Sequence, residues 1–312
     1  MRKWMLPSFL FLVLLLLLIS PQRYFSSVQG GILLFASSVL PSMLPYFFFT
    51  KLLTGTGCVP TLTATVGKPL GRAYGLSPVV AYPFLMSLLS GYPVGAKVLS
   101  DMHAKGLIDE EDARRAASFT STSGSMFVLG SVGAVILKDM GAGVVILVAH
   151  YLGAFLNGFF YRGKGKKASL SMLLSPETEN LLSDAMYESV FSLAAVGGFI
   201  AVAGLLADMF FDILSLCGVG GSLVGNAFGV ILYSAFEVTR GCVEAAALGI
   251  SRVWTAALAC FAVSFGGLSV LLQSMAFLGK TGLRGGKFLL MKTTQALLSF
   301  ALAVALGSLF LK

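Results

Sequence analysis

Long apolar stretches separated by short polar ones dominate the pattern of this chain. Apolar spans of about the 20 residues that cross a bilayer as a helix are expected at roughly 28–53, 116–137, 141–161, 188–214, 254–278 and 288–311. A further apolar run, 4–19, follows Arg2 and Lys3 in the manner of a signal peptide. Because no small-x-small cleavage pattern comes after it, we expect a retained N-terminal anchor helix over 1–27.

Two apolar segments contain residues that interrupt helices. Segment 77–102 holds the sequence SGYPVGAK, in which Gly91, Pro93 and Gly95 precede Lys97, and segment 223–250 holds AFEVTRGC at 235–242. Lipid cannot replace the lost backbone hydrogen bonds, so each interruption must be buried in protein or line a wet cavity. The arms of the first segment are too short to cross a bilayer, which favours a re-entrant hairpin. Broken helices of this kind form substrate sites in transporters.

The same order of elements occurs twice: span, hairpin, broken span, span. The broken spans begin with SFTSTSGS at 118–125 and SFGGLS at 264–269. At a separation of 146 positions, Gly95 aligns with Gly241, Ser118 with Ser264, Phe119 with Phe265, and Ser123 with Ser269. We therefore predict an all-α polytopic membrane protein with two inverted structural repeats, 28–161 and 188–312, each with a re-entrant hairpin and a broken transmembrane helix. A basic cytoplasmic linker, 162–187, joins them.

Composition and charge support this class of protein. The chain is 56% hydrophobic and 12% charged with a mean hydropathy of +0.88, values outside the range of soluble domains. The net charge is +8, but the basic residues lie between the apolar spans and form no nucleic-acid reading motif. No nucleic-acid partner is therefore expected. With a cytoplasmic N-terminus and non-crossing hairpins, fifteen Lys and Arg residues fall inside and four outside. The hairpins would then enter from opposite faces and meet near the midplane.

Three cationic residues fall within membrane segments: Lys97, Arg240 and Lys292. Such charges are costly unless paired or hydrated, which makes each a site candidate. Lys97 and Arg240, near the ends of half-helices, would suit a small carboxylate-bearing solute. The alternatives are snorkelling of Lys97 toward the interface and an ion pair of Arg240 with Glu237 or Glu244. We expect Lys292 to snorkel from near the cytoplasmic end of its helix.

Polar residues at the interruptions complete the expected substrate-binding set, which is Gly91, Tyr92, Gly95, Lys97, Thr120, Ser121, Ser123, Glu237, Arg240, Ser269 and Gln273. Each hydroxyl taken alone fits backbone satisfaction better than substrate binding. Glu237 or Glu244 could carry a coupled proton, and the oxygens of the broken spans could instead hold Na⁺. No other cofactor is expected. For His150, interhelical hydrogen bonding is favoured over a proton relay.

Enzyme signatures are lacking in the sequence. It contains no HExxH, G-x-S-x-G or P-loop motif, and the pairing of Ser123 with His150 has no oxyanion or third-residue signature. The four cysteines, including Cys58, lack metal-ligand spacing and fit small packing residues. We expect no enzymatic activity.

The motifs SGYPVGAK, SFTSTSGSMFVLGSVGA and SFGGLSVLLQ, in this order, resemble those of the YlbJ-type sporulation integral membrane proteins, of the nucleoside-recognition (Gate) domain family. The resemblance covers roughly 28–311. It implies a core similar to that of concentrative nucleoside transporters, a role in endospore formation and transport of dipicolinate into the developing spore. It also implies a place in the cell membrane or the outer forespore membrane. Dipicolinate is a dianion that would suit Lys97 and Arg240.

The expected function is therefore transport of a small organic anion, dipicolinate first, by alternating access at a midplane site between two hairpin tips. One alternative is a nucleoside transporter, which would favour neutral hydrogen-bonding side chains over cations. Another is a membrane scaffold in sporulation that moves no solute. The sequence leaves open a homo-oligomer and any sporulation membrane partner.

Overall fold

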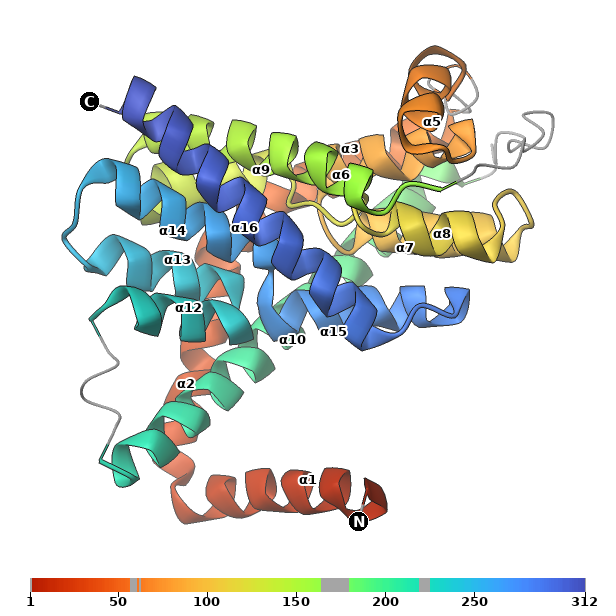
Figure 1. Ribbon diagram of the computed structural model, residues 1–312. Coiled ribbons are helices and arrows are strands. Elements are labelled where there is room, and N and C mark those ends of the chain that lie inside the picture. Colours follow the sequence, from red (N-terminus) through yellow and green to blue (C-terminus); the bar gives the residue numbers. More distant parts are fainter. Residues whose placement is uncertain (1, 57–60, 62, 164–179, 219–224, 312) are drawn as a thin grey trace.

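The structure, a computed structural model, describes residues 2–56, 61, 63–163, 180–218 and 225–311, and within them it is all-α (Figure 1). Four helical segments are long and apolar enough to cross a membrane: α9 (Met140–Phe160), α10 (Leu181–Leu216), Arg252–Thr281 and α16 (Gly285–Phe310). Two bent helix pairs raise this number to as many as six. The predicted all-α membrane architecture is confirmed. Cys58 and most of the predicted linker, 164–179, lie outside the described residues.

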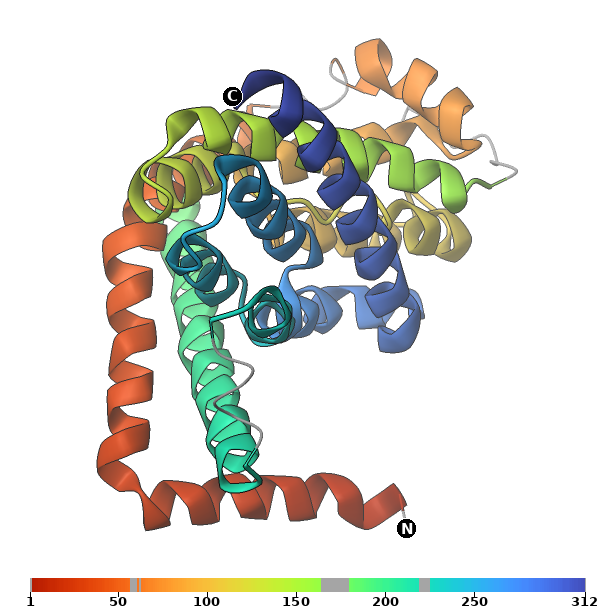
Figure 2. The same ribbon diagram turned by 60° about the vertical axis from the view of Figure 1, so that its left-hand side comes forward.

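The N-terminal helices form a sharp corner. Helix α1 (Arg2–Ile19) meets α2 (Pro21–Leu34) at a bend of 106°, and Figure 2 shows α1 lying across the end of the paired α2 and α10. The α2 helix continues through a π-helical stretch, Phe35–Val39, into α3 (Leu40–Gly55). Since α1 and α2 are almost perpendicular, they do not both follow one membrane normal. The predicted crossing by the anchor helix stays a prediction.

The first half contains the predicted hairpin and broken span. Helices α6 (Ala81–Ser90) and α7 (Val94–Ala104) pack against each other on either side of Gly91–Pro93. They follow the short elements Thr63–Gly67, α5 (Lys68–Tyr74) and Pro78–Val80. Next comes α8 (Glu110–Ala116), a non-helical segment over 117–124, and a π-helical stretch, Phe127–Ile136, which leads to α9. We call 117–124 the first break.

The second half repeats this order. After α10, helices α12 (Ala227–Phe236) and α13 (Val238–Ala247) form a hairpin whose turn is the single extended residue Glu237. Helix α14 (Arg252–Phe265) ends at Gly266, which has a left-handed φ of 80°, and α15 (Gly267–Leu278) starts directly after it. We call Gly266–Gly267 the second break. A short 3-10 turn, Gly279–Thr281, leads to α16. The inverted relation of the halves stays a prediction.

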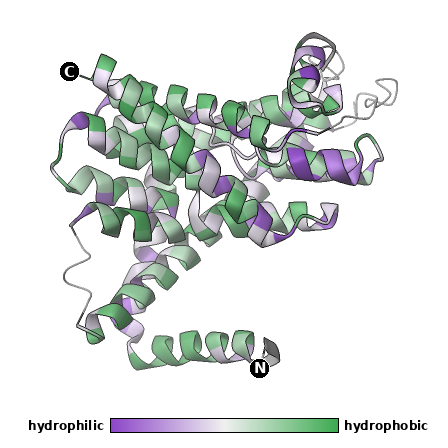
Figure 3. Ribbon diagram, viewed as in Figure 1, coloured by the Kyte–Doolittle hydropathy of each residue, from purple (hydrophilic) through white to green (hydrophobic). Residues whose placement is uncertain are grey.

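Small residues allow the central helices to approach closely. A Cβ atom at Gly153 in α9 would lie 2.0 Å from the Ser299 Oγ in α16, so only glycine fits there. Helices α9, α14 and α16 pack together, while α10 packs on α2 and α3. Figure 3 shows hydrophobic residues along most helices and a concentration of hydrophilic ones on α8.

Candidate functional site

The tip of the first hairpin lies directly on the first break. Gly91 has a φ of 81°, and a Cβ there would lie 2.4 Å from the Gly124 backbone nitrogen. A Cβ at Gly95, inside α7, would lie 1.9 Å from the Thr120 carbonyl oxygen. Any side chain at either position would push the two segments apart. These predicted site residues are therefore glycines because backbone meets backbone at this contact.

The second hairpin makes the corresponding contact with the second break. A Cβ at Gly267 would lie 2.5 Å from the Ser234 carbonyl oxygen of α12. Within the hairpin, a Cβ at Gly241 would lie 2.2 Å from the Ser234 Oγ, which closes α12 onto α13. Each hairpin thus packs on the interrupted helix of its own half.

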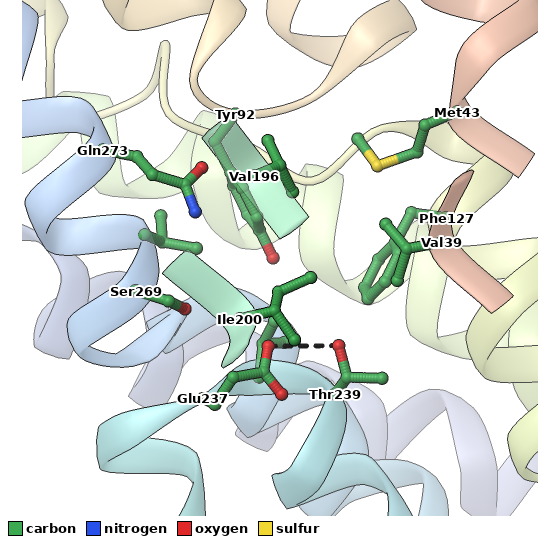
Figure 4. A pocket seen from close by; sticks show the side chains of 12 residues that line it. Val39, Met43, Tyr92, Phe127, Val196, Ile200, Glu237, Thr239, Ser269 and Gln273 are labelled. Atoms are coloured by element: carbon green, nitrogen blue, oxygen red, sulfur yellow. Dashed lines mark hydrogen bonds between the residues drawn. The ribbon is translucent and has the colours of Figure 1, made fainter. Parts of the chain in front are cut away.

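The two hairpin tips share one small cavity, which we call the tip cavity (Figure 4). Its polar lining comes from both hairpins and from α15: Tyr92, Glu237, Thr239, Ser269 and Gln273. Apolar side chains of α3, α10 and neighbouring segments, such as Met43 and Ile200, complete the wall. The cavity holds about 20 Å³, room for a single water molecule. Four of the predicted site residues, from both halves, are brought together here.

Glu237 caps helix α13 from within the wall of this cavity. Its Oε2 accepts a hydrogen bond from the Arg240 backbone N–H at 2.7 Å, and its Oε1 accepts one from the Thr239 hydroxyl at 3.1 Å. The residue is 1% exposed. A carboxylate at a helix N-terminus is stabilised by the unpaired amides and the helix dipole. Glu237 therefore fixes the shape of the second tip.

Arg240 points away from the tip cavity. Its guanidinium lies 3.3 Å from an Asp208 carboxylate oxygen in α10 and 3.7 Å from one of Glu244, and it stacks over the Tyr233 ring at 5.1 Å. Of the two ion pairs that the sequence left open, the structure contains the one with Glu244. The main acidic partner, Asp208, comes from another helix. The structure thus directs the Arg240 guanidinium away from the other predicted site residues, although the Arg240 backbone N–H bonds to Glu237.

Lys97 lines a second cavity, of about 170 Å³, which we call the outer cavity. Its Nζ lies 2.9 Å from the Glu188 Oε2, and the same carboxylate also binds Lys51. The outer cavity runs between α7, α10 and α15 and shares Val196 and Gln273 with the tip cavity. Lys97 therefore belongs to an outer compartment that adjoins the tip cavity.

Three long side chains from α9 and α16 support the first break. Asn157 donates through Nδ2 to the Ser118 carbonyl at 2.8 Å. Lys292 donates through Nζ to the Ser121 carbonyl at 2.7 Å. His150 accepts at Nε2 from the Ser123 backbone N–H at 2.9 Å. Backbone groups freed by a broken helix need such partners, and here side chains supply them.

His150 joins the two halves of the chain. Because the Ser123 N–H can only donate, the Nε2 must be unprotonated, so the Nδ1 carries the proton and donates to the Ser264 Oγ at 2.7 Å. The ring is neutral and fully buried. Both nitrogens are used in structural bonds, which confirms the expected interhelical hydrogen bonding.

The prediction that Lys292 snorkels to the membrane surface is wrong. The residue is 2% exposed, and its Nζ also donates to the Gln295 Oε1 at 3.0 Å and lies 6.0 Å from the centre of the Tyr92 ring. The side chain turns inward because the first break offers it a carbonyl oxygen. A polar stripe at helical spacing in α16, formed by Lys292, Gln295 and Ser299, is the sequence signal that could have revealed this.

Buried polar atoms without partners concentrate around these segments. Among the described residues they include the hydroxyls of Thr120 and Ser121 and the Gln273 Oε1. Native proteins seldom leave such atoms unpaired, since each costs about 1–3 kcal/mol. All three belong to predicted site residues. Water or a polar solute would satisfy them.

The fold and this site together define an integral, multi-pass membrane protein whose polar groups gather where two helical hairpins face two interrupted helices. In sequence the chain is similar to the sporulation integral membrane protein YlbJ of Bacillus subtilis (strain 168), with 26% identity over 326 aligned positions covering 93% of this chain and 79% of the relative. No family model and no solved structure matches. This similarity agrees with the resemblance to the YlbJ-type sporulation integral membrane proteins that the motifs predicted.

Proposed function

We propose that the protein transports a small organic anion across a membrane during endospore formation, with dipicolinate as the first candidate. The observation that carries this proposal is the group of unpaired buried polar atoms where the hairpin tips and the first break converge. A scaffold gains nothing from such atoms, whereas a solute site needs hydrogen-bonding groups that a passing solute can engage and release.

The distribution of charge favours an anion. Lys51 and Lys97 share the single carboxylate of Glu188, so this cluster of three side chains has one positive charge in excess. Deeper in the protein, Lys292 has no carboxylate within ion-pairing distance among the described residues. Uncompensated positive charge along a route attracts anions and raises their local concentration.

The two cavities suggest how a solute would move. The outer cavity of about 170 Å³ is large enough for a small solute, while the tip cavity of about 20 Å³ is not. The solute would enter beside Lys97 and pass Gln273, and the tips would have to separate before it could proceed. Motion of one hairpin at a time gives alternating access.

Uptake of dipicolinate into liposomes that contain the purified protein tests the proposal. Protein liposomes should accumulate dipicolinate faster than empty ones, and Lys97→Ala should reduce the rate about tenfold at low solute concentration, equivalent to one lost charge interaction of about 1.4 kcal/mol. Lys287→Ala, an exposed lysine of α16, is the matched control and should leave uptake unchanged. Equal uptake in protein and empty liposomes would reject transport and leave the scaffold role.

Arg240 needs a different variant. Removing its guanidinium leaves the buried carboxylate of Asp208 without its partner, so Arg240→Ala should lower stability. The double variant Asp208→Asn with Arg240→Gln removes both charges. Uptake that is retained in the double variant would show that Arg240 is structural, whereas a loss of uptake in a stable protein would return it to the solute site.

A nucleoside is the second candidate solute. The polar lining of the tip cavity is mostly neutral and includes the groups of Tyr92, Ser269 and Gln273, which could hydrogen-bond a base or a ribose. Competition separates the candidates: excess pyridine dicarboxylates should suppress dipicolinate uptake, and excess nucleosides should not. Suppression by nucleosides alone would favour the second candidate.

A place in the cell membrane or the outer forespore membrane, with a cytoplasmic N-terminus, belongs to the same proposal. Reporter fusions at the two ends of the chain, imaged during sporulation, would test it. Activity of an N-terminal fusion to a reporter that works only outside the cytoplasm would overturn the proposed orientation.

A further inference from the structure

The two polar atoms that contact the Lys292 Nζ are oxygens of the kind that bind metal cations. The Nζ contacts the Ser121 carbonyl oxygen at 2.7 Å and the Gln295 Oε1 at 3.0 Å. The Ser121 hydroxyl, on the residue that supplies the carbonyl, has no hydrogen-bond partner in the described structure. Carbonyl, carboxamide and hydroxyl oxygens at a break in a helix are the ligands that Na⁺ takes up in transporters.

The orientation of Gln295 is informative. Its carboxamide turns the oxygen toward Nζ, although this leaves the buried Nε2 without a partner. No donor among the described residues is directed at Nζ, so no group there favours the lone pair of the neutral amine. The nearby imidazole of His150 donates its proton to Ser264. Both polar groups that contact Nζ are acceptors, which suits an ammonium because it has only donors.

We propose that the Lys292 ammonium is a tethered cation that permanently fills a monovalent-cation site at the first break. Lys292 belongs to α16 in the second half, and its ammonium supplies the positive charge at the first break that a dissolved ion would otherwise supply. The inference goes beyond the proposed function, because it concerns how the break is held and applies whichever solute moves.

Two consequences follow. The protein with Lys292 in place needs no Na⁺ or K⁺ at this break, because the site is already occupied. A variant without the side chain leaves an oxygen-lined space of ammonium size that a small free cation could enter. The chemical class of the expected ligand is a monovalent cation such as Na⁺, K⁺, ammonium or methylammonium.

Thermal unfolding of purified full-length protein tests the inference without any transport measurement. Lys292→Ala is compared in chloride salts of Na⁺, K⁺, ammonium and methylammonium, with N-methylglucamine as a large cation that cannot enter and with ionic strength held constant. At a concentration ten times its Kd, a cation that fits should raise the Tm of the variant by about 2–4 °C. The Tm of the wild type should be the same in all five salts.

Lys287→Ala is the matched control, because this lysine lies in the same helix and is exposed. Its Tm should not depend on which cation is present. If the Tm of folded Lys292→Ala is the same in every salt, or if Na⁺ specifically stabilises the wild type, the inference is overturned.

A fallback covers a variant that does not fold in the absence of cations. Lys292→Ala and Lys292→Gln are then extracted and purified with each salt present throughout. Recovery of folded Lys292→Ala only with a small cation supports the tethered cation. Recovery of folded Lys292→Gln alone, with no salt rescuing Lys292→Ala, would show that the lysine serves as a hydrogen-bond donor and overturn it. Dipicolinate uptake plays no part in either readout, so failure here is distinguishable from failure of the proposed function.

Discussion

The two breaks occupy the same place in the order of their halves and are built differently. The first break leaves eight residues, 117–124, out of regular helix and relies on side chains from two other helices. The second break is a turn of two glycines: the Gly266 N–H bonds back to the Ala262 carbonyl, and the left-handed φ values of 80° and 70° redirect the chain at once.

The difference shows how a broken membrane helix can be stabilised in two ways. Glycines close the second break with backbone geometry alone, so it adds few polar groups to the interior. The first break exposes carbonyls and amides that need partners, and His150, Asn157 and Lys292 provide them. The positions 146 further along from His150 and Asn157 are the small residues Ala296 and Ala303. Side-chain support of broken backbone is therefore concentrated at the first break.

The largest effect is expected from crowding the second break. Gly267→Ala should lower the free energy of unfolding by about 3 kcal/mol or more, because it combines a left-handed φ with a Cβ 2.5 Å from the Ser234 carbonyl oxygen. Gly106→Ala is the matched control: its φ is also 70° but nothing lies within 4 Å of the added Cβ, so about 1 kcal/mol is expected. Denaturation in detergent measures both. Equal losses would mean that strain, not contact with the hairpin, holds the second break.

A slightly smaller effect is expected from removing a support of the first break. Asn157→Leu leaves the buried Ser118 carbonyl without its donor and deprives the Thr294 hydroxyl of an acceptor, so stability should fall by about 2–3 kcal/mol. Ser308→Ala in α16 removes only an exposed bond to its own helix and should change stability by less than about 0.5 kcal/mol. A change in Asn157→Leu no larger than in Ser308→Ala would contradict the view that side chains hold this break.

The smallest effect concerns a tie between the two interrupted helices. Asp139 follows the interrupted helix of the first half and caps α9. It accepts two hydrogen bonds, of 2.6 and 2.9 Å, from Arg252, which begins the interrupted helix of the second half. The Arg252 guanidinium lowers the pKa of the Asp139 carboxyl below its ordinary 3.8, against the opposing effect of burial. A depressed carboxyl pKa stabilises the fold above the ordinary pKa, and that contribution is lost as the pH falls through the lowered value.

Melting temperatures as a function of pH test this tie. Between about pH 5 and pH 3 the wild type should lose more in Tm than Asp139→Asn, which keeps a capping side chain without the charge. Parallel curves for the two proteins would show that the ion pair is too hydrated to contribute.

Much of the fold followed from the sequence, because helix interruptions are local. The glycines at 91 and 267 indicate turns by their residue type, and the length of each apolar stretch predicts a membrane span. The direction in which a side chain leaves its helix depends on partners far along the chain. Arg240 faces α10 because Asp208 lies there, and Lys292 turns inward because Ser121, 171 positions away, presents a carbonyl. Asp208 and Ser121 are both far in the sequence from the side chains that they bind. Side chains of α1, α2 and α10 likewise pack together at the corner between α1 and α2, although they lie far apart in the sequence.

Gln273 and Val196 separate the outer cavity from the tip cavity, so the partition is only one layer of side chains thick. Exposed side chains change rotamer in picoseconds to nanoseconds, whereas packed helices shift in microseconds to milliseconds. Gln273 and Val196 are both buried, so their rotamers can change freely only when the helices around them move. Under the proposed function, the partition and the hairpins would open together, at the pace of the helices.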